Sequence, residues 1–377
     1  MKLNYMREKL KSGFRRFSIR IFSHLGTGTK IAVIGHERHT SQCCRWYLGR
    51  SEENRRTTLP LLGPRHFLAR RLSKRYGLAV VSDWGNERRM AKKALQVPWC
   101  VWLYLPIPKD TESLKRSMKA DRNKINQITR IFSYAISTSR EDFEYFYNRQ
   151  HRPTVLGSWG KEAIIGDHEV LLRGLGQGGF LLKVFQEGRW VASQYCEICG
   201  DSLAMKILGV NGGDYDSLHN FTTRAIYWFS ACICIDRGLS RLGLSGIPPN
   251  TSDSFSFFKL SVRPRIDLHG TFRACFFFYL DLSHPHCRQM LSTQTIVFWE
   301  GEHLSAIGSL PDQWAVEEMC MKNRFYQDLK SYYSIAATEE GRRQALEPTG
   351  LLPASITPFV TRFSTNTSRK HLEIRNA

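Results

Sequence analysis

The sequence predicts an α/β (α+β) protein in which mixed, mostly antiparallel sheets are flanked by helices. Strand-like apolar runs alternate along the chain with amphipathic helical segments, which is the pattern of such folds. With 377 residues the chain is longer than one hydrophobic core usually supports, so two domains are expected. The hydrophobic content of 42% and the aromatic content of 12% are enough to fill those cores. No apolar run approaches the ~18 residues of a transmembrane helix, so no transmembrane helix is expected.

The first lobe is assigned to residues 26–135. Strands are predicted at residues 31–35, 78–83 and 97–105, where Val, Ile and aromatic residues are concentrated, and a helix at residues 87–95. Two prolines then interrupt the chain, and a helix capped by Asp110 or Thr111 follows. Its apolar positions fall at helical spacing, and its other faces carry a basic stripe that includes Arg122 and Lys124. This helix would connect the two lobes.

The second lobe is assigned to residues 136–285. Its predicted elements are helices at 141–151 and 161–175, a three-stranded meander at 178–210, a helix at 220–238, a strand at 241–245, a short helix that begins near Ser252 and carries Lys259, and a last strand at 271–282. Residues 286–377 form a C-terminal extension with a helical stretch near 312–345. Its Ser/Thr/Asn-rich end is expected to be disordered.

Residues 1–25 are predicted to form a basic amphipathic helix. Apolar residues recur at gaps of three or four, and Lys and Arg occupy the other faces. Such a helix lies on an anionic membrane surface through residues 1–22, or packs on the protein's own core with a solvated basic face. Amphipathicity alone does not separate the two interpretations. The segment lacks the continuous apolar region of a signal peptide.

The net charge of +20 predicts attraction to polyanions, such as phosphate-bearing cofactors, RNA or an anionic membrane. Several of the ten cysteines lie in apolar runs, which is typical of buried thiols in a reducing, cytoplasmic compartment. Cys196 and Cys199 have the spacing of a zinc half-site, but no second pair follows. A strand with one cysteine on each face is the simpler interpretation, and no metal site is predicted.

Two glycine-rich stretches invite comparison with phosphate-binding loops. The stretch at residues 174–180 runs from a helix into a strand, whereas phosphate loops run from a strand into a helix. It is therefore interpreted as a helix C-cap followed by a turn. The stretch at 209–220 follows a strand and precedes a helix, and Gly212 and Gly213 would let the backbone approach a phosphate there.

Three segments of the chain resemble those of a known enzyme family. Residues 102–128 resemble its strand, proline break and basic helix, residues 142–165 its tyrosine-rich first helix and proline-containing exit, and residues 231–260 its helix, strand and closing Phe-Lys. The family is FemAB, peptidyl and acyl transferases with two GNAT-like acyltransferase lobes in tandem. The resemblance covers about residues 100–280 and implies a tandem GNAT-like fold.

The resemblance also implies a set of site residues. Lys259, beside Phe258, would supply positive charge to the oxyanion of acyl transfer, Asp253 would orient the acceptor, and His151 is a candidate general base. The candidate substrate-binding residues are Tyr147, Arg122, Lys124 and Phe258, and the candidate donor-binding residues are Gly212 and Gly213. Each has an ordinary structural alternative, such as a surface lysine, a helix-terminal acid or a solvated basic face.

One departure from the family bears on the donor. GNAT enzymes that bind acetyl-CoA usually carry an Arg/Gln-x-x-Gly-x-Gly/Ala turn after the fourth strand, and in this chain residues 209–220 take its place. Asp214 and Asp216 would oppose a dianionic group there. The donor is therefore left open between acyl-CoA and aminoacyl-tRNA, as a co-substrate and not a permanently bound cofactor.

The function expected from the resemblance is direct transfer of an acyl or aminoacyl group to an amine or hydroxyl of a cell-envelope or sugar acceptor. The sequence contains no nucleophile elbow and no carboxylate dyad that would indicate a covalent intermediate. The alternative is a non-catalytic module on the same fold that binds RNA or a membrane through its positive charge.

Overall fold

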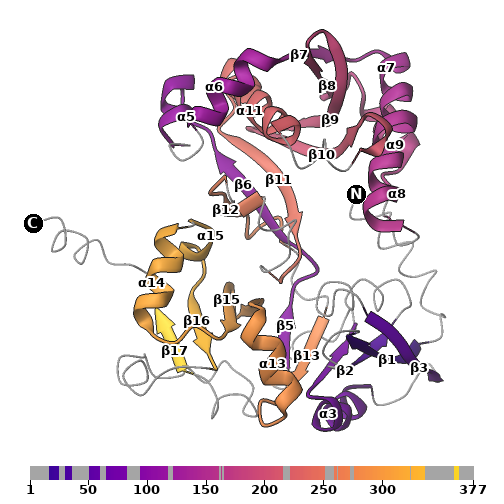
Figure 1. The fold of residues 1–377 in the computed structure, drawn as a ribbon, viewed down its shortest axis with the longest axis vertical. Helices are drawn as coiled ribbons and strands as arrows, with labels where there is room; N and C mark the ends of the chain where they lie inside the picture. Colours follow the sequence, from indigo (N-terminus) through magenta and orange to yellow (C-terminus); the bar gives the residue numbers. More distant parts are fainter. Residues whose placement is uncertain are drawn as a thin grey trace, which may run out of the picture. The chain divides into compact units, whose positions relative to one another are not determined.

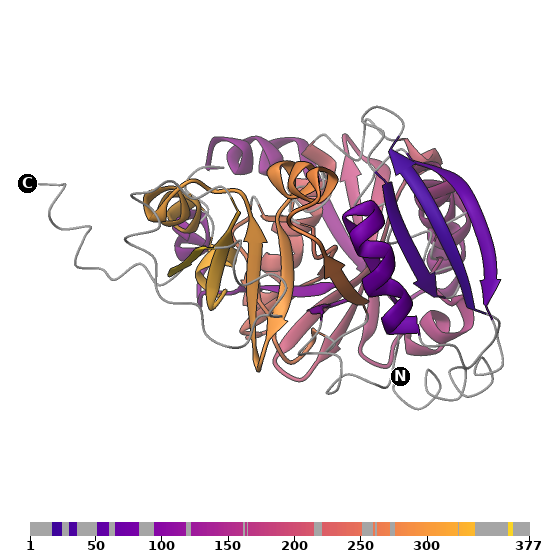
Figure 2. The same ribbon diagram turned by 90° about the horizontal axis from the view of Figure 1, so that it is seen from below.

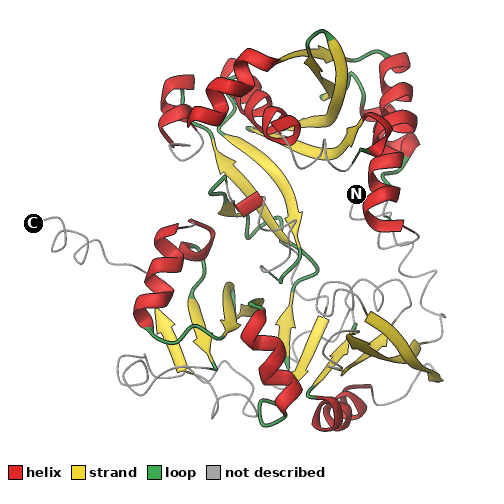
Figure 3. Ribbon diagram, viewed as in Figure 1, coloured by secondary structure: helices red, strands yellow, loops and turns green. Residues whose placement is uncertain are grey.

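The computed structural model divides the chain into two compact units, each of which is described by itself (Figures 1 and 3). One unit combines residues 1–101 with 246–377, and the other is residues 102–245. The structure describes residues 17–24, 30–35, 51–59, 65–82, 94–117, 122–160, 163, 165–214, 221–250, 259–260, 262–271, 276–322, 324–335 and 361–364.

The second unit, residues 102–245, is built on one mixed sheet. Its strands are β6 (Val101–Pro106), β7 (Phe132–Ser137), β8 (Gly179–Gln186), β9 (Arg189–Cys199), β10 (Ser202–Val210) and β11 (Arg241–Ile247). They lie in the order β6-β11-β10-β9-β8-β7. The predicted meander is confirmed, because β8, β9 and β10 pair antiparallel. Its turns have positive φ at Glu187 and Gly188 and at Gly200.

Helices cover both faces of this sheet. They are α5 (Thr111–Ser117), α6 (Arg122–Ile131), α7 (Arg140–Tyr145), the π-helix η2 (Phe146–His151), α8 (Arg152–Trp159), α9 (His168–Gly174) and α11 (Phe221–Asp236). On β9, Tyr195 packs with Phe143 of α7, whereas the side chain of the next residue, Cys196, lies beside Ser230 of α11. Because side chains alternate along a strand, α7 and α11 lie on opposite faces.

The first unit contains a larger mixed sheet. Among the described residues its strands are β1 (Phe17–His24), β2 (Lys30–Gly35), β3 (Ser51–Leu59), β4 (Leu78–Val81), β5 (Leu95–Val97), β13 (Phe276–Leu280), β14 (Ile296–Glu300), β15 (His303–Gly308), β16 (Ser331–Ser334) and β17 (Thr361–Ser364). Their order is β17-β16-β15-β14-β5-β13-β4-β2-β1-β3. Strands from both ends of the sequence therefore share one sheet. The short strand β12 (Arg265–Ile266) also belongs to this unit.

The inner strands of this sheet are buried on both faces, which explains their continuous apolar sequences, whereas residues 54–57 of the edge strand β3 are exposed. Phe276 and Phe278 of β13 pack in one core with α13 (Pro285–Thr293), and Phe277 packs in the other with α3 (Arg65–Tyr76). Helices α14 (Gln313–Lys322) and α15 (Arg324–Gln327) follow β15 in the chain. Figure 2 shows the helices and strands from below.

The predicted fold class is confirmed, since both sheets mix parallel and antiparallel pairs and carry helices on their faces. The second unit has the expected order from its helices through the meander to helix α11 and strand β11, whereas the last predicted strand is β13 of the first unit. The unit boundaries differ from the predicted lobes at 26–135 and 136–285. Residues 246–285 and the extension from 286 belong to the first unit, because β13 to β17 complete its sheet.

Several predicted elements need correction. The N-terminal helix is wrong where it can be checked, because Phe17–His24 form strand β1, and residues 1–16 lie outside the described residues. Residues 97–105 form two strands, since Pro98, Trp99 and Cys100 interrupt them. The helix predicted at 161–175 is shorter, at His168–Gly174, and residues 331–334 are a strand. The helix predicted at 87–95 lies outside the described residues, apart from Ala94 and Leu95.

The interpretations of Cys196, Cys199 and the stretch 174–180 are confirmed. Cys196 is buried and Cys199 exposed on β9, and Gly176 and Gly178 have positive φ between α9 and β8. Within the described part of the chain, no helix is long and apolar enough to cross a membrane. No group of three or more His, Cys, Asp or Glu side chains is arranged for a metal ion among those same residues.

Candidate functional site

The second unit contains a place where two parallel strands separate. Strand β10 pairs with β11 over Ser202–Ala204, opposite Arg241–Gly243. The register of β10 against β9 then shifts between Met205 and Ile207. Ser245 of β11 adopts a φ of 63° and donates its hydroxyl to the Met205 carbonyl. A side chain here replaces the strand pairing, so β10 continues beyond its contact with β11.

Side chains of the helical segment 146–159 occupy the far end of this β10 edge. His151 Nδ1 donates to the Leu208 carbonyl at 2.9 Å, and the Val210 amide donates to Thr154 Oγ1 at 3.0 Å. Thr154 Oγ1 in turn donates to the Gln150 carbonyl at 2.7 Å. These β10 groups are therefore not available to an extended ligand that would pair with the edge as an additional strand.

His151 is a neutral imidazole in this environment. A carbonyl only accepts, so Nδ1 carries the hydrogen, and Nε2 faces the Gly166 amide at 3.5 Å as the acceptor. Burial, with only 2% of the residue exposed, lowers the pKa of His151, against a smaller opposite effect of the bond to Leu208. A role as general base stays a prediction, because the lone pair on Nε2 would have to leave Gly166 to reach a substrate.

Two glycines permit the helical segment to approach β10. A Cβ at Gly209 would lie 2.4 Å from the His151 amide nitrogen, and one at Gly213 would lie 2.6 Å from the Pro153 carbonyl carbon. Real Cβ atoms do not approach backbone this closely. The π-helix turn, which often marks functional sites, places both Gln150 and His151 toward β10.

A closed ring of hydrogen bonds fixes the turn that follows β10. Trp190 Nε1 donates to Ser193 Oγ at 2.7 Å, and Ser193 Oγ donates to Gln150 Oε1 at 2.7 Å. Gln150 Nε2 donates to Asn211 Oδ1 at 2.8 Å, and Asn211 Nδ2 donates to the Trp190 carbonyl. The indole can only donate, so it sets the direction of every bond in the ring. Because Gln150 is fully buried, the ring holds Asn211 firmly.

The turn itself, Asn211–Gly213, is the segment predicted to hold the donor phosphate. Gly212 has a φ of 64°, and a Cβ there would have nothing within 4 Å, so the backbone at Gly212 is open. Asp214 follows and is exposed. The turn carries backbone amides that can face an anion, with one carboxylate nearby that opposes it. Residues 215–220, between the turn and α11, lie outside the described residues.

Lys259 lies in the first unit and is buried, with 5% of the residue exposed. Its Nζ donates to the Gly246 carbonyl at 3.0 Å. Burial lowers the pKa of Lys259 from the ordinary 10.5 to about 7, and Cys100 opposes part of the effect. The ammonium and the neutral amine are therefore comparably populated near neutral pH. Asp253 and Phe258, predicted beside it, lie outside the described residues.

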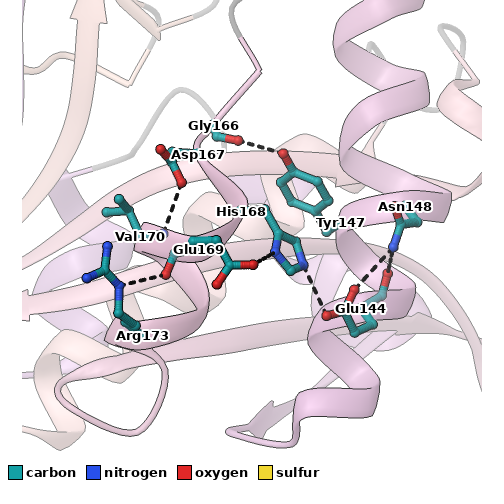
Figure 4. A network of polar contacts seen from close by, with 9 residues as sticks. All are labelled: Glu144, Tyr147, Asn148, Gly166, Asp167, His168, Glu169, Val170 and Arg173. Carbon is teal, nitrogen blue, oxygen red and sulfur yellow. Dashed lines mark hydrogen bonds and ion pairs between the residues drawn. The ribbon is translucent and has the colours of Figure 1, made fainter. Parts of the chain in front are cut away.

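Tyr147 belongs to the contact network drawn in Figure 4. Its hydroxyl donates to the Gly166 carbonyl at 2.7 Å, and burial raises the pKa of Tyr147. Beside it, His168 Nε2 is 3.0 Å from Glu144 Oε1, and Nδ1 is 3.1 Å from Glu169 Oε1. Both ring nitrogens face carboxylates, so both carry hydrogen, and the two glutamates raise the pKa of His168 despite partial burial. This network joins α7 to α9.

The single basic helix that was predicted is described as two helices, α5 and α6, and Arg122 and Lys124 of its basic stripe belong to α6. Ile125 and Ile128 of this helix are buried, as the helical spacing predicted, and Lys124 is exposed. Arg122 begins the helix, and its side chain lies outside the described residues. A phosphate-binding role for either residue stays a prediction.

Sequence reasoning missed four residues that shape this site: Gln150, Thr154, Gly209 and Asn211. A buried glutamine and a helix-interior threonine carry no motif, and the partners that join them to β9, β10 and the turn lie more than 40 residues away in the chain. Gly209 lies in the glycine-rich stretch 209–220, but the predicted site included only Gly212 and Gly213 of that stretch. The proline at 153, inside an otherwise helical pattern, was the one local indication of irregular geometry.

No family model and no curated protein matches the sequence. Among solved structures, FemX is similar at 10% identity over 74% of this chain and 91% of that chain, with a TM-score of 0.35. The ribosomal-protein-S18-alanine N-acetyltransferase from Escherichia coli is similar at 16% identity over 29% of this chain, with a TM-score of 0.22. The similarity spans 64% of that enzyme, slightly less than two thirds. The PaiA N-acetyltransferase from Thermoplasma acidophilum, solved with coenzyme A, is similar at 16% identity over 28% of this chain and 75% of that chain, with a TM-score of 0.22.

Proposed function

We propose that this chain is a FemAB-type N- or O-acyltransferase. It transfers an acyl or aminoacyl group directly from a phosphate-bearing donor, acyl-CoA or aminoacyl-tRNA, to an amine or hydroxyl of a cell-envelope or sugar acceptor. The observation that supports this most is the end of β10, where the strand leaves β11 and runs into a rigidly held glycine turn that precedes α11. Backbone amides at such a turn suit a phosphate.

The reaction needs few groups from the protein. The acceptor nitrogen or oxygen forms a bond to the donor's carbonyl carbon, and the resulting oxyanion collapses as the donor's thiolate or ribose oxygen leaves. The acceptor's proton passes to a base or to the leaving group. Lys259 is proposed to stabilise the oxyanion as an ammonium, with Asp253 orienting the acceptor and Phe258 excluding water. His151 remains the candidate base, and Tyr147, Arg122 and Lys124 the candidate substrate contacts.

Donor binding tests the proposal directly. A ligand of the native state raises the melting temperature, so titration with acetyl-CoA, longer acyl-CoAs and aminoacyl-tRNA should give a saturable rise for one class. The Lys259→Ala variant should then bind that donor but transfer its acyl group at least tenfold more slowly, by analogy with the loss of one oxyanion donor. Wild-type turnover in this variant would remove Lys259 from the mechanism. The absence of a thermal shift with any donor would reject donor binding.

A non-catalytic module that binds RNA or an anionic membrane is the second candidate, and the net charge of +20 favours it. The two candidates respond differently to salt. Counterion release makes polyanion binding fall by about 10³-fold or more when salt rises from 50 to 200 mM, if six or more phosphates are contacted. The affinity for a single donor that binds saturably should fall far less over the same range of salt. A cytoplasmic location, which includes the inner surface of the membrane, is proposed for either candidate.

A further inference from the structure

An aromatic ladder, formed by the rings of Tyr145 and Trp190 and the ammonium group of Lys183, lies beside the glycine turn of the second unit. The rings of Tyr145 and Trp190 have centroids 4.7 Å apart and planes inclined by 34°. Lys183 Nζ lies 4.1 Å from the centroid of Trp190, and it is held there by an ion pair of 2.8 Å with Asp142. Tyr145 is the outer member of this ladder, and 43% of it is exposed although one side of its ring is covered by Trp190. Tyr145 is therefore largely exposed although its ring packs against Trp190.

The ladder and the turn are parts of one rigid assembly. The Tyr145 hydroxyl donates to Asn211 Oδ1 at 3.4 Å, and Asn211 is the first residue of the turn. Trp190 also belongs to the hydrogen-bond ring that holds Asn211. An exposed, immobilised aromatic face consequently lies next to the open backbone of Gly212.

We propose that Tyr145 is a stacking platform for the purine ring of an adenosine, with the phosphate of the same nucleotide at the Asn211–Gly213 turn. The inference rests on the proposed function and names the part of the donor that this end of the site recognises. Both donor classes contain an adenosine next to a phosphate: coenzyme A in its nucleotide half, and aminoacyl-tRNA at its 3′ terminus. Every base has a π-face, so stacking on tyrosine suits either source.

The inference predicts how much affinity Tyr145 contributes. Base stacking on an aromatic side chain is lost on substitution by alanine at a cost that corresponds to roughly a fivefold to hundredfold weaker affinity. Tyr145→Ala should therefore weaken binding of coenzyme A and of adenosine 3′,5′-bisphosphate by at least fivefold. Tyr145→Phe keeps the ring and loses only the long contact to Asn211, so its affinity should stay within about twofold of wild type.

Calorimetric titrations of the full chain test this with matched probes and a matched control. The control is Leu156→Ala, which removes a side chain of the same 43% exposure from α8. The probes are coenzyme A, adenosine 3′,5′-bisphosphate, 4′-phosphopantetheine, which lacks adenosine, and an RNA minihelix ending in a 3′ adenosine. Only adenosine-containing probes should respond to Tyr145→Ala, and the tighter of coenzyme A and the minihelix identifies the source.

The outcomes separate this inference from the proposed function. Equal affinity of wild type and Tyr145→Ala for every adenosine probe overturns the stacking platform, as does an equal loss for 4′-phosphopantetheine. Wild-type protein that binds neither coenzyme A nor the minihelix also overturns it. Acyl transfer from an acylated 4′-phosphopantetheine by the Tyr145→Ala variant at the wild-type rate would leave the acyltransferase proposal standing in the first two cases, whereas the third case also rejects the proposed donors.

Discussion

Replacing Lys259 with methionine should change how the stability of the protein depends on pH. Burial lowers the pKa of Lys259 from the ordinary 10.5 to about 7. Between about pH 7 and pH 10.5 the unfolded chain binds a proton at this position that the folded chain does not. The free energy of unfolding therefore rises with pH across this window. At about 1.4 kcal/mol per pKa unit, the difference amounts to at most about 5 kcal/mol. Methionine has a similar length and no charge, so its contribution should not vary with pH.

The measurement is urea unfolding of wild type and Lys259→Met at pH values from about 6 to 10. The variant should be more stable at the acid end by several kcal/mol, and the difference should shrink steadily as pH rises. Lys124→Met, at an exposed position on α6, is the control for removing a lysine charge from the protein surface. A difference between Lys259→Met and wild type that is constant with pH would show that the lysine is hydrated or carries a buried counter-charge, and would refute the argument.

Three further perturbations test separate parts of the second unit. Gly209→Ala places a Cβ 2.4 Å from the His151 amide nitrogen and should lower the free energy of unfolding by about 1–3 kcal/mol. Gly157→Ala in α8, where the added Cβ would lie 3.8 Å from its nearest neighbour, should raise it by up to about 1 kcal/mol. Equal effects of the two variants in urea unfolding would contradict the close approach of residue 151 to β10. The raised pKa of His168 stabilises the fold below the unfolded pKa, and this stabilisation is lost as pH rises through the folded pKa. His168→Gln should therefore remove that loss of stability, and parallel pH profiles of wild type and variant would argue against the contacts to Glu144 and Glu169. Peptide mapping after alkylation of the native protein should find Cys199 modified well before Cys196, because the Cys196 thiol is buried and has a raised pKa. Equal rates of modification would disprove that the two cysteines lie on opposite faces of β9.

The parts of the fold that the sequence predicted are those governed by local patterns. The meander β8–β10 was recognisable because Glu187-Gly188 and Gly200-Asp201 supply the left-handed residues that its turns require. Helix α11 was recognisable because a long apolar segment ends at Gly238, which has a φ of 66°. The helix–strand order that followed was enough to predict a GNAT-like lobe.

The missed elements depend on partners that are distant in the sequence. In β1, Phe17 and Ile21 are four residues apart, which suits one face of a helix and equally one face of a strand. Pairing with β2 and β3 decides between them. The unit boundary was missed for the same reason, because β13 enters between β4 and β5 from almost 200 residues away. Of the candidate site, the turn was predicted, whereas Gln150 and Thr154 are identified only by what they contact.

The contacts along β10 restrict how a donor can bind to the second unit. An extended ligand that pairs with a strand needs free backbone donors and acceptors at alternate residues. On β10 these backbone groups already have hydrogen-bond partners. Ser202–Ala204 pair with β11, Met205 accepts from Ser245, Leu208 accepts from His151, and Val210 donates to Thr154. The first open backbone after them is at Gly212. Recognition of the donor through β10 is therefore expected to concentrate at the turn and at the aromatic face of Tyr145, which both donor classes can use.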